Sequence, residues 1–281
     1  MNQSLLFALI SLIFAGANDA LFKRQALSGQ CKGQYMSVVG TVWLIVFSIA
    51  ALLHGPFIPN RQTIVYGLSV GAISAIGNYL YIYSMNKLEA SVAATIYRLN
   101  LALAACIAMI FLNENMTALN FLGVVFACLA VLLFAGKHLT DAAGMWATLC
   151  IAIIASIFRA FMGIGYKLAM NNGVNADWFL SGSGLCWLLV GISMAYLGKK
   201  QFSPARDTLI NGFVSGFLVC GIVYFFAVAL KTGKACIVIP IAQMSFIVTA
   251  IISFFLFKEK FSYTKIAGML FACLSIILLG Q

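Results

Sequence analysis

The sequence predicts an all-α polytopic membrane protein, in which ten transmembrane helices form two inverted five-helix repeats. Composition is the first of three observations behind this prediction. Of the 281 residues, 63% are hydrophobic and 9% are charged, and the mean hydropathy is +1.03, unlike an ordinary soluble domain. The second is a series of apolar stretches, each close to the roughly 20 residues that an α-helix needs to cross the hydrocarbon core. The third is a similarity between the two halves of the chain.

The apolar stretches are joined by short segments rich in turn-forming residues, which leaves no room for a soluble domain. The first stretch resembles the core of a signal peptide, but no basic segment precedes it, so we expect it to remain as a helix of the mature protein. The predicted spans are Ser4–Arg24, Tyr35–Leu53, Ile64–Tyr83, Ser91–Leu112, Ala118–Ala135, Met145–Leu168, Asp177–Leu197, Leu209–Leu230, Ala235–Phe257 and Thr264–Gly280.

The strongest organisational signal is an internal repeat. Asn120–Phe134 (NFLGVVFACLAVLLF) and Lys265–Leu279 (KIAGMLFACLSIILL) share a Gly, the tetrapeptide FACL and a Leu in one register, 145 residues apart. The same register places Glu114 on Glu259, and each Glu follows a long apolar span. These matches predict that the chain is a tandem duplication of one five-helix unit.

The ends of the first and sixth spans match as well. An offset of 144 places Lys23 on Lys167 and Gly29 on Gly173. Coincident Lys, Glu and Gly positions make a chance match between apolar segments a poor explanation.

We therefore predict a first repeat over residues 1–140 and a second over residues 141–281. Because each unit has an odd number of spans, the second unit must enter the membrane from the opposite side, so the halves are inverted. Secondary transporters often have this organisation, with a small-molecule substrate site near the membrane midplane between the repeats. Channels also contain inverted repeats, so the pattern favours transport without requiring it.

This arrangement resembles the drug/metabolite transporter superfamily, specifically its EamA-type members. A Lys ends the first helix of each half, and a Glu closes the fourth helix before a Gly-containing approach to the fifth. The resemblance implies a substrate cavity lined mainly by helices one, three, four, six, eight and nine, with helices five and ten peripheral. One departure is that Phe14 and Ala15 stand where many relatives have a tryptophan before the Gly-x-Asn of the first helix. The residues that carry the resemblance are Lys23, Lys167, Glu114 with Gly123, and Glu259 with Gly268.

Asp19 is the only acidic residue clearly inside a predicted span. A charge near the middle of the bilayer costs at least about 2.5–3.5 kcal/mol on insertion scales, so it needs a partner, an aqueous cavity or a route to the interface. Lys23, one helical turn further on, could neutralise Asp19 locally. Alternatively, Asp19 and the neighbouring Asn18 form part of a substrate or proton site. Burial favours the neutral form of a carboxylate, which makes Asp19 the candidate for proton coupling.

Arg98 is a permanent charge inside the fourth span. It lies about 12 Å from the face where that span begins, and Asp19 lies about 7 Å from the same face, at 1.5 Å of rise per residue. An Asp19–Arg98 pair is therefore allowed and could be purely structural. Arg98, with Tyr97 beside it, could instead bind a substrate carboxylate or phosphate, because the guanidinium fork fits such groups. Extension of the side chain to the membrane interface is a third reading.

Arg159 is a second intramembrane arginine, and its span contains no acidic residue. It has no local explanation, so we favour a role at the cavity over a structural one. Gln243 aligns with Arg98 in the repeat. Pro240 removes a backbone donor nearby and is expected to break the ninth helix, so that carbonyl groups open towards the cavity.

Helices three and eight supply two further candidates. Asn78 and Tyr224 lie deep in their spans, although an interhelical hydrogen bond is the competing reading. Tyr81 and Tyr83 lie at a helix end and are expected in the aromatic belt at the interface. The candidate substrate site therefore consists of Asn18, Asp19, Asn78, Tyr97, Arg98, Arg159, Tyr224 and Gln243.

Other polar or small residues favour structural roles. Glu114 and Glu259 end their helices and are expected to cap helices or anchor loops. The spacings Gly67–Gly71 and Gly212–Gly216 are typical of close helix packing.

The remaining motifs exclude several functions. The eight cysteines are scattered without a C-x-x-C, the two histidines lie in loops, and there is no phosphate-binding loop. Seven dispersed acidic residues supply no catalytic cluster. We therefore expect no enzyme activity, no catalytic residues, no metal and no cofactor. The net charge of +10 is spread over short loops, which suits anionic lipid headgroups better than nucleic acid.

Two signals conflict over orientation. The odd-numbered loops hold eleven Lys and Arg and the even-numbered loops hold four, which by the positive-inside rule places both termini outside. The resemblance implies that both termini are cytoplasmic, and we follow it. We expect an integral protein of the bacterial inner membrane, monomeric or homodimeric.

The expected function is proton-coupled, secondary active transport of small polar metabolites by alternating access. Amino acids or other carboxylates are favoured because Arg98 and Arg159 outweigh Asp19, and export by proton exchange is favoured over uptake. The alternative is an exporter of drugs or lipophilic cations, if Asp19 is accessible and both arginines are sealed in structural pairs. A membrane scaffold or sensor without transport activity is a third possibility.

Overall fold

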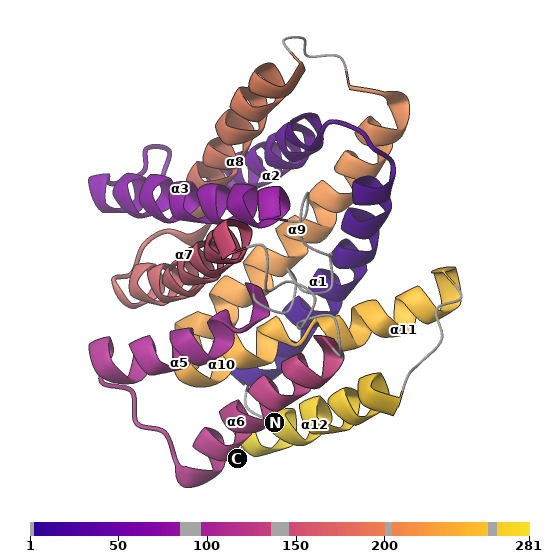
Figure 1. Ribbon diagram of the computed structural model, residues 1–281. Helices are drawn as coiled ribbons and strands as arrows, with labels where there is room; N and C mark the ends of the chain where they lie inside the picture. The colour runs from indigo at the N-terminus through magenta and orange to yellow at the C-terminus, as the bar shows by residue number, and fades with distance from the viewer. Residues whose placement is uncertain (1–2, 85–96, 136–145, 200–203, 258–262) are drawn as a thin grey trace.

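The computed structural model is all-helical over the residues that it describes, which are 3–84, 97–135, 146–199, 204–257 and 263–281 (Figure 1). It contains no strand in this part of the chain. Its helices are α1 (Gln3–Leu27), α2 (Lys32–His54), α3 (Arg61–Ser84), α5 (Asn100–Phe111), α6 (Ala118–Ala135), α7 (Trp146–Asn171), α8 (Ala176–Lys199), α9 (Arg206–Thr232), α10 (Ala235–Gln243), α11 (Phe246–Phe257) and α12 (Tyr263–Leu279).

These helices confirm the predicted fold class. Each predicted span corresponds to one helix within a few residues at either end, with two exceptions. Of the fourth span, the structure describes only the part from residue 97 onwards, which includes α5, and the ninth span is divided into α10 and α11. The predicted repeat boundary at residues 140–141 lies outside the described residues.

Length and composition identify membrane-spanning segments among these helices. Seven segments of the described chain are long and apolar enough to cross a membrane: α1, α2, α3, α7, α8, α9 and the stretch Ala235–Ile252. Helices α5, α6 and α12 are shorter apolar helices. Many large apolar side chains point outward, such as Phe111 (74% exposed) and Leu197 (85% exposed), as contact with lipid requires. The protein is therefore a polytopic membrane protein.

The contacts between helices follow the internal repeat of the sequence, so that a contact in one half has an equivalent in the other. Helix α1 packs on α9, and its counterpart α7 packs on α3. In the same way α2 packs on α9 and α8 on α3, and α1 packs on α11 and α7 on α5, while the counterparts α2 and α8, and α6 and α12, pack on each other. Exchanging the two halves leaves this set of contacts unchanged, which is the pattern that two copies related by a two-fold axis produce.

Aromatic pairs show where this axis runs. Trp43 and Trp187 occupy equivalent positions, and their ring centroids lie 5.6 Å apart. Phe126 and Phe271, from the two FACL segments, lie 5.4 Å apart. Because a residue meets its own counterpart only close to the axis, these contacts support the inverted arrangement predicted from the odd number of spans.

Small residues allow the repeats to approach closely, as predicted. A β-carbon at Gly71 of α3 would lie 2.6 Å from the Cα atom of Ser183 on α8. A β-carbon at its counterpart Gly216 on α9 would lie 2.6 Å from the Cβ atom of Val42 on α2. Any larger side chain at either position would push two helices apart.

Both fourth helices break at one register, which positions the site. The first repeat has a turn at Leu99, and the second has one at Met244–Ser245. The Ala102 N–H donates to the Leu99 carbonyl (3.2 Å), and the Ile247 N–H donates to the Met244 carbonyl (3.1 Å). These i→i−3 bonds replace the i→i−4 bonds of a continuous helix.

The prediction that Pro240 breaks the ninth helix is therefore wrong in position. Pro240 lies inside α10, and the helix ends after Gln243.

Candidate functional site

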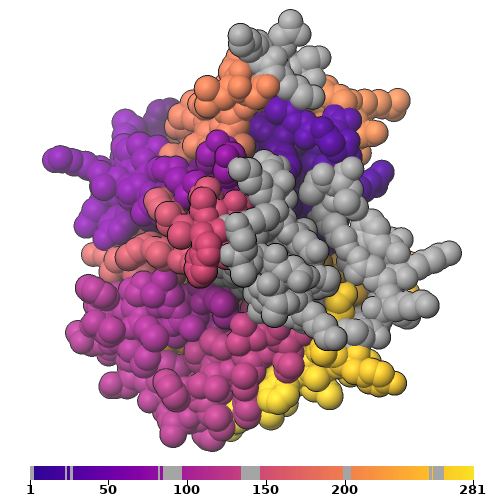
Figure 2. Space-filling view, viewed as in Figure 1, coloured from indigo at the N-terminus to yellow at the C-terminus, as the bar shows by residue number. Residues whose placement is uncertain are grey.

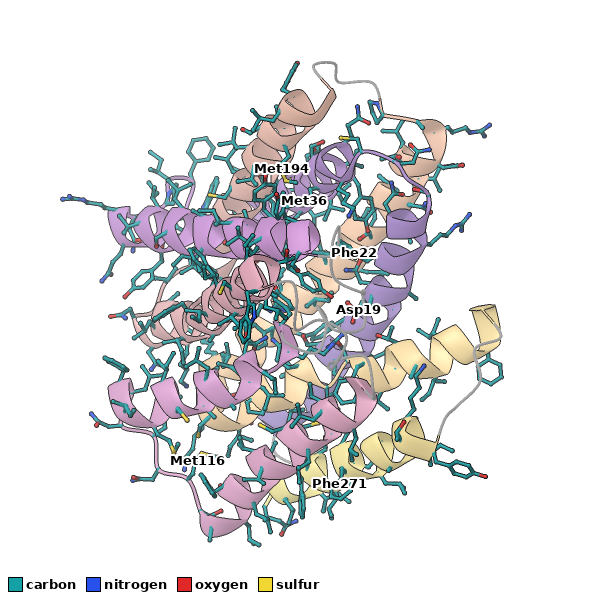
Figure 3. The ribbon with its side chains drawn as sticks, in the orientation of Figure 1. Asp19, Phe22, Met36, Met116, Met194 and Phe271 are labelled. Atoms are coloured by element: carbon teal, nitrogen blue, oxygen red, sulfur yellow. The ribbon has the colours of Figure 1, made fainter. Side chains whose placement is uncertain are left out.

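An ion pair lies at the centre of the bundle, between α1 and the start of α5. The Arg98 guanidinium donates through Nη2 to the Oδ2 atom of Asp19. The exposed fraction of the side chain is 15% for Arg98 and 35% for Asp19. Figure 3 shows Asp19 on α1 in the middle of the molecule, one turn before Phe22. The similar depths estimated for the two residues thus correspond to a contact, while the alternative partner, the side chain of Lys23, lies outside the described structure.

The break between α10 and α11 provides the other partners of Arg98. Because Ile247 bonds to Met244, the carbonyl of Gln243 lacks its helical partner. Arg98 Nη1 donates to this carbonyl (2.8 Å) and to the Ser245 hydroxyl (2.8 Å). A guanidinium at the carboxyl end of α10 also interacts favourably with the helix dipole.

Asp19 meets the opposite end of the next helix. Its Oδ2 atom lies 3.2 Å from the Ser245 hydroxyl and 3.2 Å from the Thr249 hydroxyl, in the first turn of α11. The amino-terminal end of a helix favours a negative charge. The two halves of the broken helix therefore hold the two members of the ion pair, the cation at the end of α10 and the anion at the start of α11.

A second arginine is linked to this pair by aromatic rings. Tyr97 stacks on Tyr81 with centroids 4.1 Å apart, and its hydroxyl donates to Asn78 Oδ1 at 3.5 Å. The Cζ atom of Arg159 lies 5.9 Å from the centroid of the Tyr97 ring, within the range of a cation–π interaction. Tyr97 thus lies beside both arginines.

Arg159 is weakly neutralised. Its Nη1 atom lies 3.4 Å from the sulfur of Met162, and its Nε atom is buried without a hydrogen-bond partner. Within the described residues it forms no ion pair. This part of the cluster holds two guanidinium groups and one carboxylate, so its formal charge is +1.

The structure brings together six of the eight predicted site residues: Asp19, Asn78, Tyr97, Arg98, Arg159 and Gln243. Gln243 contributes its backbone carbonyl, and its side chain is buried. The other two residues point elsewhere. Asn18 accepts a hydrogen bond from Ser215 on α9, and Tyr224 is 44% exposed with its ring against Phe225.

Sequence reasoning missed three residues of the cluster. Ser245 and Thr249 are one helical turn apart after the break, and this spacing was the available signal. Tyr81, assigned to the membrane interface, instead packs between Phe22 and Tyr97. Its position three residues after Asn78, on the same face of α3, could have indicated this.

Glu114 and Lys167, which match a Glu and a Lys in the other repeat, make structural contacts at helix ends. For Glu114 this is the role that the sequence predicted. Its carboxylate accepts from the N–H groups of Ala235 (2.9 Å) and Cys236 (2.8 Å) and so caps α10. Lys167 donates to the carbonyl groups of Leu230 (2.9 Å) and Gly233 (2.7 Å) at the end of α9. Glu259 lies outside the described residues.

Figure 2 shows the face on which α5 and α6 lie below α3, with α12 to their right.

In the described part of the chain, no group of His, Cys, Asp and Glu residues is arranged to hold a metal ion.

Comparisons with known proteins identify the family. The sequence profile of the EamA-like transporter family matches the chain twice, over residues 2–136 and 146–281. No curated protein matches by sequence. One solved structure, titled only as the crystal structure of a protein, superimposes with a TM-score of 0.84 over 98% of this chain and 95% of its own, at 10% identity. That likeness concerns the fold alone. The two profile matches cover nearly the whole chain, and the protein therefore belongs to the EamA-like transporter family, within the drug/metabolite transporter superfamily.

Proposed function

We propose that this membrane transporter exports small carboxylate-bearing metabolites, such as amino acids, in exchange for protons. The observation that carries the proposal is the excess of positive charge in the cluster. Arg98 is paired with Asp19, whereas Arg159 has no anionic partner among the described residues. An uncompensated charge inside a membrane is costly, and an anionic substrate would compensate it.

The chemistry around Arg159 suits a carboxylate. A guanidinium offers two parallel N–H donors to the two oxygens of a carboxylate, and the Cζ atom of the Arg159 guanidinium lies over the Tyr97 ring, 5.9 Å from its centroid. The cluster is formed by α1, α3, α7 and the broken fourth and ninth helices, so both repeats contribute to it. A site of this kind, between inverted repeats and beside broken helices, is common in secondary transporters.

Asp19 is the group that we assign to proton exchange. Its side chain is more exposed than that of Arg98, so a proton can reach it without separation of the helices. Protonation would remove the negative charge from Arg98 and would alter the balance of the whole cluster.

We further place the protein in a bacterial inner membrane, as a monomer or homodimer, without enzyme activity, cofactor or nucleic-acid partner.

Efflux from proteoliposomes tests the proposal. The purified protein is reconstituted into vesicles loaded with labelled amino acids, other carboxylates, sugars or lipophilic cations, and the outside medium is acidified. We expect efflux of carboxylates that accelerates with external acid and stops when a protonophore removes the gradient. Protein-free vesicles are the control. Absence of transport of any solute would contradict the proposal and favour a scaffold or sensor.

A second candidate function is export of lipophilic cations. The greater exposure of Asp19, at 35% against 15% for Arg98, favours it, because an accessible carboxylate attracts cations. The same assay separates the two functions, since efflux of cations alone would favour this candidate.

A further inference from the structure

We propose that Asp19 and Tyr35 bind the ammonium group of an α-amino acid, so that substrate and proton compete for Asp19 while Arg159 holds the substrate's carboxylate. The inference rests on the proposed function and narrows its carboxylates to those that carry an ammonium group. It involves one proton transfer. The Asp19 carboxylate takes a proton from water when the ammonium leaves and returns it to water when the ammonium binds.

Only one of the two carboxylate oxygens of Asp19 is used within the described part of the chain. The bonds from Arg98, Ser245 and Thr249 all meet Oδ2, and none of the described residues bonds to Oδ1. The side chain is nevertheless 35% exposed in the middle of the bundle (Figure 3). Each oxygen of a carboxylate can accept hydrogen bonds, so Oδ1 is available to a donor on an entering substrate.

A second acceptor lies near this carboxylate. The Tyr35 hydroxyl of α2 is buried, has no hydrogen-bond partner of regular geometry, and is within electrostatic reach of Asp19. Packing does not require this hydroxyl, because Phe179 stands at the equivalent position. Tyr35 packs edge to face on Phe22, as Phe179 does on Tyr166. Buried polar atoms without a partner are rare, and an ammonium group, with three N–H donors, can satisfy both oxygens.

The other end of the site carries the excess positive charge. The Nε atom of Arg159 is buried without a hydrogen-bond partner. The Tyr81 hydroxyl is within electrostatic reach of both Asp19 and Arg159, so the anionic and cationic ends are grouped around one side chain. An α-amino acid carries its ammonium and its carboxylate on the same carbon atom, and therefore suits two opposite charges that are close together.

The direction of coupling distinguishes an amino acid from a simple carboxylate. In exchange, the protein carries either the substrate or the proton, so each must weaken the binding of the other. Protonation of Asp19 would leave the charges of Arg98 and Arg159 without an anion, which strengthens the attraction for a simple carboxylate. Such a substrate would bind together with the proton and move in the same direction.

An ammonium group reverses this sign. Protonation replaces the charged acceptor of the ammonium with a neutral carboxyl group, and Arg98 then repels the ammonium without compensation. The substrate's carboxylate lies farther from Asp19, beside Arg159, and electrostatic energy falls with distance, so the effect on the ammonium dominates. Protonation therefore weakens binding, and by reciprocity the entering ammonium expels the proton.

The other titratable and charged groups near Asp19 leave it as the only carboxylate of the site. These groups are Tyr35, Tyr81, Tyr97, Arg98 and Arg159. In the described part of the chain, α9, α10 and α11 contribute uncharged hydroxyl, amide and backbone groups. On α1 itself, the side chain of Lys23 lies outside the described structure. Substitution of Asp19 therefore identifies its own proton.

Binding to the purified protein in detergent micelles tests the inference. The common amino acids are added at near-neutral pH, in weakly buffered solution with a pH indicator. For each one that binds, the comparison ligand is the carboxylic acid that lacks only its amino group. Calorimetry measures both affinities for the unmodified protein, Asp19→Asn, Tyr35→Phe and Tyr66→Phe. Tyr66→Phe is the matched control, because its hydroxyl contacts Asn172 at 3.1 Å, away from the site.

We expect the amino acid to release protons as it binds and the comparison acid to take protons up. Asp19→Asn should abolish both proton signals. Tyr35→Phe should weaken the affinity for the amino acid by roughly tenfold, as loss of a hydrogen bond to a charged group does, and leave that for the comparison acid nearly unchanged. Tyr66→Phe should change neither affinity.

Proton uptake with the amino acid, or equal proton signals for the two ligands, would overturn the inference. So would binding of carboxylic acids when no amino acid binds, or an equal loss of both affinities in Tyr35→Phe. The efflux assay decides the proposed function separately. Acid-driven efflux of carboxylates that lack an ammonium group would remove this inference alone, whereas absence of efflux of any solute would remove the proposed function.

Discussion

Arg98 is satisfied by three kinds of partner: the Asp19 carboxylate, the Gln243 carbonyl and the Ser245 hydroxyl. Its pairing with Asp19 follows from the depth of two charged residues in their spans. The carbonyl could not be predicted in the same way, because it is available only through the helix break. Hydrophobic periodicity shows where helices run, and it carries no signal for a local change in hydrogen bonding.

The ion pair predicts a coupling energy. A double-mutant cycle of Asp19→Asn and Arg98→Gln should give an interaction of about 1–3 kcal/mol, as contacting charged residues do. Unfolding in mixed micelles measures it. Asp177→Asn, on α8, combined with Arg98→Gln is the control and should be additive. Additivity in the Asp19 cycle as well would show that the pair contributes nothing to stability.

At the scale of elements, the duplicated break is informative. Proline is not its cause, because the first repeat has the same turn at Leu99, where the position equivalent to Pro240 is Thr95. Pro240 has no N–H group, so the Cys236 carbonyl, four residues earlier, cannot receive a helical hydrogen bond from it. Helix α10 nevertheless continues past Pro240 to Gln243. The reliance on Pro240 explains why the break was predicted at the wrong place in one repeat and overlooked in the other.

The capping of α10 by Glu114 leads to a prediction about stability. Glu114→Gln keeps the shape of the side chain but removes the charge that accepts two N–H groups at the start of that helix. We expect a loss of about 1–2 kcal/mol in the free energy of unfolding, the range of caps and charge-assisted bonds. Asp207→Asn, at the exposed start of α9, is the control. A loss of the same size in both variants would contradict specific capping.

Two glycines test the repeat at the level of backbone conformation. Gly29 and Gly173 both have φ = +66°, and a β-carbon at either would have no atom within 4 Å. Gly29→Ala and Gly173→Ala should therefore each destabilise by about 1 kcal/mol through backbone conformation alone. Thermal unfolding measures both. Clearly unequal losses would show that the two turns are not equivalent.

At the scale of the whole molecule, composition and the internal repeat predicted the spans and the inverted arrangement of the two halves. They did not predict the asymmetry of the site. Asp19 and Arg98 have Gly163 and Gln243 at the equivalent positions, so the charges belong to one half only. Which side chains meet across the repeats depends on helix rotation, and for this reason Ser245, Thr249 and Tyr81 were missed.

Orientation is a prediction for the whole chain. The two ends lie side by side (Figure 1), and a β-carbon at Gly280 would lie 3.2 Å from the side chain of Leu5, as an even number of spans requires. Following the family, we expect a reporter enzyme fused after Gln281 to be active in the cytoplasm. External activity would instead support the positive-inside count and would place the α1–α2 turn on the cytoplasmic face.

The most direct test of the account is the apparent affinity for a transported carboxylate in proteoliposomes containing Arg98→Ala, Arg159→Ala or the surface control Arg61→Ala. Hydrogen bonds to charged groups contribute about 1.5–3 kcal/mol, so loss of the Arg159 guanidinium should weaken affinity by roughly tenfold to a hundredfold. We expect Arg98→Ala to weaken it too, and Arg61→Ala to have no effect. Unchanged affinity in both Arg98→Ala and Arg159→Ala would contradict the assignment of the two arginines to substrate binding.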